Sequence, residues 1–104
     1  MVNPDKAIYS AVRTGKVVFG SRRSLNLLKT GKARMIIVAS NAPKDLRMLV
    51  DYYSKGASIP VYVYNGTSIE LGRVCGKPFP VMMLAVRDPG ESNIMELVAE
   101  SYEE

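Results

Sequence analysis

Residues 34–39 constrain the fold most, because the five residues after Arg34 form an unbroken apolar run from Met35 to Ala39. A strand with one solvent-exposed face alternates apolar and polar residues, whereas an unbroken run is typical of a strand covered on both faces. Shorter strand patterns at residues 16–19, 59–64 and 81–86 are separated by helical patterns, and helices flank the series at both ends. This alternation predicts an α/β fold, specifically a three-layer α/β/α sandwich with a mixed four-stranded sheet.

Caps, prolines and glycines mark where the helices begin and end. Asn3 followed by Pro4 is typical of a helix start, and Gly15 of a helix end. Later helices are expected at residues 21–31, at 43–56, from Thr67 to Gly72 or Gly76, and at about 92–99. The helix that begins at Pro43 is expected to bury one face, formed by Leu46, Leu49, Val50 and Tyr53.

The length of 104 residues predicts a single domain spanning residues 1–104. Cys75 is the one cysteine, so a disulfide framework is excluded, and this fits a reducing compartment such as the cytoplasm. Cys75 itself is expected to be a small buried hydrophobic residue. No stretch approaches the ~20 apolar residues of a membrane span, so no membrane association is expected.

Charge is segregated along the chain. Nine basic residues and one acidic residue lie between residues 13 and 47, whereas residues 88–104 carry six acidic residues and no basic one. A basic half with an acidic end is typical of a nucleic-acid-binding face with a second face that keeps the protein soluble. The alternative is two ordinary solvated faces.

The sequence lacks the residues of most catalytic and metal sites. There is no histidine, and one cysteine without a histidine forms neither a thiol–imidazole pair nor a zinc site. The three Gly-Lys pairs lack the leading glycine and the following Ser or Thr of a phosphate-binding loop. We therefore predict a protein that is not an enzyme and uses no cofactor or metal, with a small phosphate-ligand enzyme as the alternative.

Three loops carry the candidate binding residues. In α/β sheets, ligands meet the chain beyond the carboxyl ends of strands. Two of the loops follow strands there, and the third enters the last strand. Arginines at a helix start suit phosphate, an asparagine amide reads base edges, and a ring between prolines supports an unstacked base. The candidates are Gly20, Ser21, Arg22, Arg23 and Ser24 in the first loop; Asn41, Ala42, Pro43, Lys44 and Arg47 in the second; and Phe79, Pro80 and Val81 in the third.

Each candidate also has a structural interpretation. Asn41 before a helix is often a cap or turn residue, Phe79 could belong to the core, and Arg22 and Arg23 could be solvated helix charges. The sequence alone leaves these alternatives open.

Several short motifs, in this order and spacing, resemble the kink-turn RNA-binding superfamily, and within it the ribosomal protein thirty-e family of the archaeal and eukaryotic large subunit. They are Thr14-Gly15-Lys16, Gly20-Ser21-Arg22-Arg23-Ser24, Ile36-Ile37-Val38-Ala39-Ser40-Asn41-Ala42, Glu70-Leu71-Gly72, Gly76-Lys77 and Asp88-Pro89-Gly90-Glu91-Ser92. The resemblance covers nearly the whole chain and implies an α/β/α sandwich without a cofactor.

The resemblance also implies the partners: large-subunit ribosomal RNA at a kink-turn or internal loop, and the ribosomal subunit, for a protein that is monomeric when isolated. It implies RNA contacts at Gly20, Ser21 and Arg22, at Asn41 and Arg47, and at Phe79 and Val81. The related proteins of modification-guide particles carry an Asn-Glu-x-x-Lys pattern where this chain has Ser21 to Ser24. This difference favours the ribosomal group over the alternatives, a guide-particle protein or a basic protein-interaction module of the same fold.

Overall fold

A computed structural model describes residues 3–97 of the chain. Its helices and strands alternate from the first helix to the fourth strand, in the order that the sequence predicts. The elements are α1 (Pro4–Thr14), β1 (Lys16–Phe19), α2 (Ser21–Lys29), β2 (Met35–Ala39), α3 (Lys44–Ala57), β3 (Val61–Tyr64), α4 (Ser68–Val74) and β4 (Met83–Asp88).

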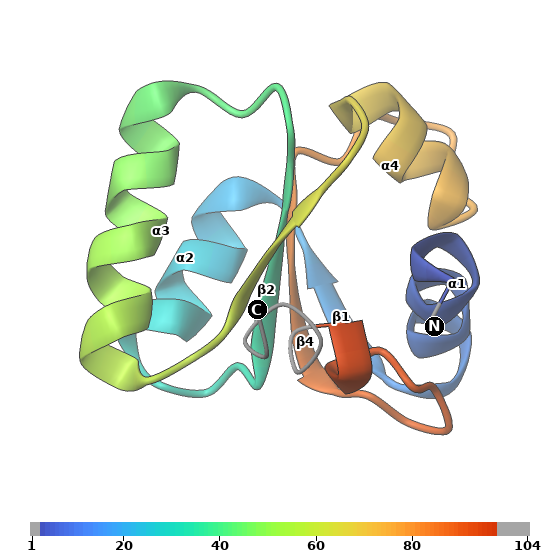
Figure 1. Ribbon diagram of the computed structural model, residues 1–104, viewed down its shortest axis with the longest axis horizontal. Helices are drawn as coiled ribbons and strands as arrows, with labels where there is room; N and C mark the ends of the chain where they lie inside the picture. Colours follow the sequence, from blue (N-terminus) through green and yellow to red (C-terminus); the bar gives the residue numbers. More distant parts are fainter. Residues whose placement is uncertain (1–2, 98–104) are drawn as a thin grey trace.

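The four strands form one mixed sheet in the order β1-β4-β2-β3. β4 is antiparallel to both of its neighbours, whereas β2 and β3 are parallel. Helices α2 and α3 lie on one side of the sheet, and α1 and α4 lie on the other (Figure 1). The predicted three-layer α/β/α sandwich with a mixed four-stranded sheet is confirmed.

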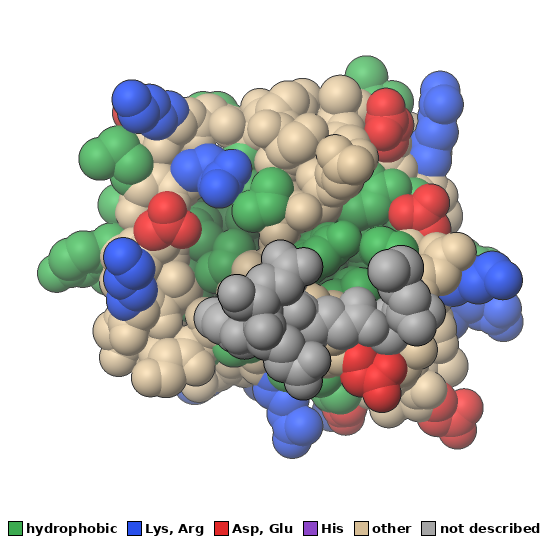
Figure 2. All heavy atoms as spheres, in the orientation of Figure 1, with side chains coloured by type: hydrophobic (Ala, Val, Ile, Leu, Met, Phe, Trp, Pro, Cys, Tyr) green, Lys and Arg blue, Asp and Glu red, His purple; other side chains and the backbone are tan. Residues whose placement is uncertain are grey.

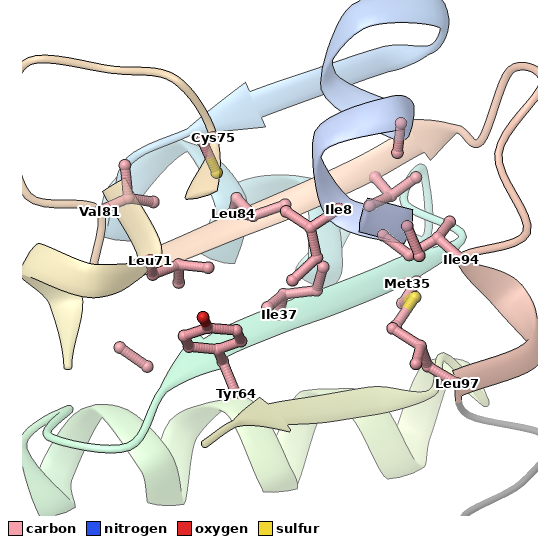
Figure 3. Packing of buried hydrophobic residues seen from close by; sticks show 14 residues of the cluster. Ile8, Met35, Ile37, Tyr64, Leu71, Cys75, Val81, Leu84, Ile94 and Leu97 are labelled. Carbon is pink, nitrogen blue, oxygen red and sulfur yellow. The ribbon is translucent and has the colours of Figure 1, made fainter. Parts of the chain in front are cut away.

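The buried strand β2 divides the core into two clusters. All five of its residues are buried, as the unbroken apolar run predicts. Met35 and Ile37 pack in the cluster beneath α1 and α4, around Ile8 and Leu71 (Figure 3). Ile36 belongs to the cluster beneath α2 and α3. Because successive side chains of a strand point to opposite faces, one apolar strand serves both layers.

Two of the predicted helix caps are confirmed by hydrogen bonds. The side chain of Asn3 accepts from the backbone N–H groups of Asp5 and Lys6 at 3.0 and 3.3 Å. The hydroxyl of Thr67 accepts from the N–H of Glu70 at 3.3 Å. Both caps satisfy donors that have no partner within the first turn of a helix.

Helix α3 departs from its prediction at both ends and on one face. It begins at Lys44, with Pro43 as the preceding cap residue, and it passes Gly56 to end at Ala57. Ser58 rather than Gly56 closes the helix, with φ 56° in the left-handed region that glycine favours. The prediction that Leu49 is buried is wrong, because Leu49 is 44% exposed. Helical periodicity places a residue on a face, but the neighbouring α2 decides how wide the covered stripe is.

Strands β3 and β4 begin two residues later than the sequence patterns indicate. Ile59 and Pro60 precede β3, and Val81 and Met82 precede β4. Val81 donates its N–H to the carbonyl of Ser68 at 2.9 Å, so it is tied to α4 rather than to the sheet ladder. Pairing of the backbone, which apolarity does not encode, therefore fixes these boundaries.

The chain after β4 crosses the edge of the sheet opposite to the candidate loops. Gly90, with φ 63°, lies against Thr14 and Gly15, where a Cβ would be 2.5 Å from the carbonyl of Thr14. A helical turn then occupies residues 95–97. The helix predicted at about 92–99 therefore begins later than expected, because residues 92–94 are not helical, and residues 98 and 99 lie outside the described range. Within residues 3–97, none of the helices has the length and apolarity needed to cross a bilayer.

Candidate nucleic-acid interface

The three candidate loops and one further loop meet at a single edge of the sheet. β1, β2 and β3 all run toward this edge, and the antiparallel β4 starts from it. The loops after β1, β2 and β3 and the loop before β4 therefore lie together, at the top in Figure 1. We call these segments the edge loops: residues 20–24, 40–47, 65–67 and 76–82.

The first edge loop turns sharply into α2 at Gly20. Its φ of 102° lies in the region that favours glycine, while a Cβ there would meet no atom within 4 Å. The backbone angle, rather than lack of space, therefore requires the glycine. The N–H of Gly20 donates to the carbonyl of Met83 at 3.1 Å, which fixes the loop to β4. Arg22 and Arg23 follow in the first turn of α2, exposed, with no acidic residue in that turn.

The structure removes the side chain of Ser24 from the predicted binding site. Its side chain is fully buried, and its hydroxyl donates to the carbonyl of Val18 at 3.3 Å. The residue packs α2 onto β1, so its side chain is not available to a ligand.

Asn41 in the second edge loop is held by a neighbouring helix. Its side-chain oxygen accepts a hydrogen bond from the backbone N–H of Ser68, the first residue of α4, at 2.9 Å. Asn41 therefore caps α4 rather than α3, whose preceding residue Pro43 makes no side-chain cap. Because the oxygen is engaged, the amide nitrogen Nδ2 is the group that Asn41 offers to a ligand.

Lys44 and Arg47 lie in the first turn of α3. Lys44 is exposed, whereas Arg47 is half-buried. Among the described residues, the Nε atom of Arg47 is the one buried side-chain nitrogen or oxygen without a hydrogen-bond partner. An unpartnered buried donor costs free energy until something satisfies it.

The third edge loop presents Phe79 to solvent. Phe79 is 48% exposed, so its interpretation as a core residue is wrong. Its carbonyl oxygen lies against α4, where a Cβ on Gly72 would approach it to 2.2 Å. This contact, together with the flanking Pro78 and Pro80, holds the backbone of Phe79 in place. Val81 next to it is 2% exposed and packs with Leu71 in the core (Figure 3), so little of its side chain reaches the surface.

The first and third edge loops enclose one hollow of about 590 Å³, which we call the inter-loop hollow. Gly20, Ser21 and Arg23 line one side of it. Phe79, Pro80 and Val81 line the other. The structure thus joins two segments that the sequence separates by more than fifty residues.

The two arginines face partly different surroundings. Arg22 and Arg23 both line a groove of about 690 Å³ between α2 and α3, together with Lys29 and Leu46. Arg23 alone also reaches the inter-loop hollow. None of the residues lining this groove or the inter-loop hollow is acidic.

Apart from Leu46 in the groove, the second edge loop lines neither of these spaces, but hydrogen bonds join it to the other edge loops. Ser40 donates both its N–H and its hydroxyl to the carbonyl of Gly66, at 2.9 and 2.7 Å. Asn41 holds Ser68, and the carbonyl of Ser68 accepts from Val81. Ser40, Gly66 and Ser68 were not among the site residues predicted from the sequence. No local sequence pattern tells which distant backbone group a loop will contact.

Cys75 is a free cysteine, and its side chain is buried. Burial raises the pKa of the Cys75 thiol to about 11, so it stays protonated near neutral pH.

The face toward the viewer in Figure 2 carries basic and acidic side chains interspersed, so it is not a uniformly basic surface.

The fold recurs in a solved structure. A structure of a protein with unknown function from Bacillus halodurans matches 95% of this chain and 99% of its own, with a TM-score of 0.79 and 21% sequence identity. At this identity the match establishes a shared fold.

The family follows from sequence comparison. The model of the Ribosomal protein L7Ae/L30e/S12e/Gadd45 family matches residues 4–96, and the chain belongs to this family. The predicted resemblance is confirmed.

Three relatives from archaea are named large ribosomal subunit protein eL30. That of Methanothermobacter thermautotrophicus is 51% identical over 94 residues, covering 90% of this chain and 96% of its own. That of Methanocaldococcus jannaschii is 55% identical, covering 90% and 86% respectively. That of Sulfurisphaera tokodaii is 46% identical over 96 residues, covering 92% and 91%.

Proposed function

We propose that this chain is a structural constituent of the large ribosomal subunit and binds a kink-turn or similar internal loop of ribosomal RNA. The observation that carries the proposal is that Arg23 and Phe79, from two different edge loops, line the same inter-loop hollow. A permanent cation and an exposed ring in one hollow suit a nucleotide, because the cation attracts the phosphate and the ring supports the base. The shared name of the archaeal relatives supports the ribosomal setting.

Each edge loop has a separate part in this proposal. Arg22, Arg23 and the open N–H groups at the start of α2 neutralise phosphates, which crowd together where an RNA strand bends. Asn41 donates from Nδ2 to a base edge or the backbone. Phe79 supports a base that has left the helical stack. Lys44 and Arg47, at the start of α3, add two further positive charges beside those of Arg22 and Arg23.

Binding would act on RNA shape. A flexible internal loop samples bent and open forms, and a protein that contacts only the bent form shifts the population toward it. Because binding accounts for this role, we assign no catalytic step to the chain.

The deciding experiment compares two RNAs of equal length, a kink-turn and an uninterrupted duplex. The proposal expects clearly tighter binding to the kink-turn, and footprinting on large-subunit ribosomal RNA fragments should protect one internal loop. Equal affinity for both RNAs would contradict it and would favour the alternative of a basic protein-interaction module. Preferential binding to modification-guide RNA over ribosomal RNA would favour the guide-particle alternative.

A further inference from the structure

Phe79 lines two hollows rather than one. The inter-loop hollow lies on the side of residues 20–23. A second hollow of about 330 Å³ lies on the side of α4 and also includes Phe79 and Pro80, the two residues common to both. We call it the α4 hollow. Its volume is at the small end of the range for ligand pockets, enough for a single small group and not for a helix.

The residues of the α4 hollow combine apolar surface with positive charge. Ile69 is 56% exposed, which is unusual for an isoleucine on a helix with a covered side. Arg73, one helical turn further along α4, and Lys77 supply two cations. The remaining lining residues are Pro78, Phe79 and Pro80, so no acidic residue lines this hollow.

The acidic residue nearest in sequence turns away from this hollow. A Cβ on Gly66 would lie 2.5 Å from the carboxylate of Glu70, so that carboxylate rests on the loop after β3. Glu70 therefore does not neutralise the positive charges of Arg73 and Lys77 at the α4 hollow.

Lys77 links the two hollows. It lines the α4 hollow, and its ammonium lies 5.1 Å from the centroid of the Phe19 ring, which lines the inter-loop hollow. A phosphate that connects groups in the two hollows would pass close to this ammonium.

We propose that the α4 hollow holds a second unstacked nucleotide of the same RNA strand, adjacent to the nucleotide in the inter-loop hollow. Ile69 and Phe79 flank its base, Arg73 faces its phosphate, and Lys77 faces the phosphate between the two nucleotides. The inference rests on the proposed function, since it requires an RNA in the inter-loop hollow. It assigns a binding role to the exposed side of α4, where the sequence predicted none.

The test measures affinity of the full chain for a synthetic kink-turn RNA. Ile69→Ala and Arg73→Gln should each weaken binding about fivefold to tenfold, the low end of what one stacked base contributes. Replacing the nucleotide next to the flipped one by an abasic residue should weaken wild-type binding similarly. On the abasic RNA, Ile69→Ala should have no further effect, because the base that it contacts is gone.

Matched controls are exposed residues of the same kind elsewhere. Leu49→Ala lies on α3 and Arg87→Gln on the opposite sheet edge, and both should bind as wild type. Ile69 and Arg73 are exposed, so folding should survive, and thermal unfolding of each variant verifies it.

The outcomes separate the two proposals. If Ile69→Ala and Arg73→Gln bind like the controls while Arg23→Gln binds weakly, the α4 hollow is not a nucleotide site and the proposed function stands. If Ile69→Ala loses as much affinity on the abasic RNA as on the intact RNA, a base in this hollow is also ruled out. If wild type does not prefer the kink-turn at all, the proposed function fails, and this inference with it.

Discussion

The side-chain oxygen of Asn41 and the backbone N–H of Ser68 lie 2.9 Å apart and form a hydrogen bond across 27 residues of sequence. This bond supplies a cap to α4 from a different loop, and it fixes the orientation of the Asn41 amide. The same side chain therefore holds two edge loops together and carries the donor that the proposed function needs.

Two substitutions of Asn41 should separate these roles. Asn41→Ala removes the acceptor for Ser68 and should cost about 1 kcal/mol of unfolding free energy, as loss of a helix cap does. Asn41→Asp keeps an acceptor at the start of α4 and should leave stability nearly unchanged. Because Asp lacks the Nδ2 donor, it should still weaken kink-turn binding at least about tenfold. Urea unfolding and RNA titration measure the two effects.

Asn93→Asp is the charge-matched control, since Asn93 is exposed and follows β4 at the opposite edge. It should bind nearly as wild type. Wild-type affinity in Asn41→Asp would mean that Asn41 is a structural cap only.

Salt dependence should report the number of phosphates that the edge loops neutralise. Four or five contacts predict a slope of log affinity against log salt of about −3 to −4, at roughly 0.7–0.9 per contact. Arg23→Gln should make that slope shallower by about one contact and should weaken binding to kink-turn and duplex RNA alike. Arg87→Gln should leave the slope unchanged, and a wild-type slope near zero would speak against a phosphate-binding edge.

Gly72 and Gly56 should respond in opposite directions to alanine. In Gly72→Ala the new Cβ would meet the carbonyl of Phe79 at 2.2 Å, whereas at Gly56 it would meet nothing within 4 Å. Gly72→Ala should lower the unfolding free energy by about 1–3 kcal/mol and displace the third edge loop, so RNA binding should weaken too. Gly56→Ala, inside α3, should raise it by about 0.5–1 kcal/mol. If both substitutions changed the unfolding free energy equally, the backbone of Phe79 could move away from Gly72 at little cost.

The Tyr64 hydroxyl should contribute to the unfolding free energy at neutral pH, and this contribution should be lost at high pH. Burial raises its pKa from 10.0 to about 12, helped by the 2.8 Å hydrogen bond that its hydroxyl donates to Asp5. Since the folded pKa is above the unfolded one, the contribution is complete below pH 10 and is lost as pH rises toward 12.

Tyr64→Phe should therefore be less stable than wild type by about 1 kcal/mol at neutral pH. The difference should shrink as pH rises above about 10, measured by urea unfolding across that range. A difference that stays constant with pH would mean that the hydroxyl does not titrate as its surroundings indicate.

Much of the fold could be read from local patterns. The unbroken run before Ala39 indicated a strand covered on both faces, Asn3 and Thr67 indicated caps, and all three predictions are confirmed. Burial of Cys75 was also correct. These features depend on a residue and its near neighbours, which is why the sequence suffices for them.

The errors concern contacts between distant segments. Leu49 has the right spacing for the buried face of α3, yet α2 does not cover it. Ser24 has the right residue type for a phosphate-binding turn, yet its hydroxyl is used by Val18. In both cases the packing of another element decides the outcome, and spacing along one helix contains no information about that element.

By itself, the sequence determined which residue types each loop carries: two arginines after β1, an asparagine after β2 and a ring between prolines before β4. Only the tertiary structure decided that they share one edge, because the strand order β1-β4-β2-β3 is set by backbone pairing between segments far apart in the chain. The same pairing set the division of Phe79 between two hollows and the partner of Asn41. Residue chemistry is local, whereas the hydrogen bonds and packing that position it depend on the whole folded chain.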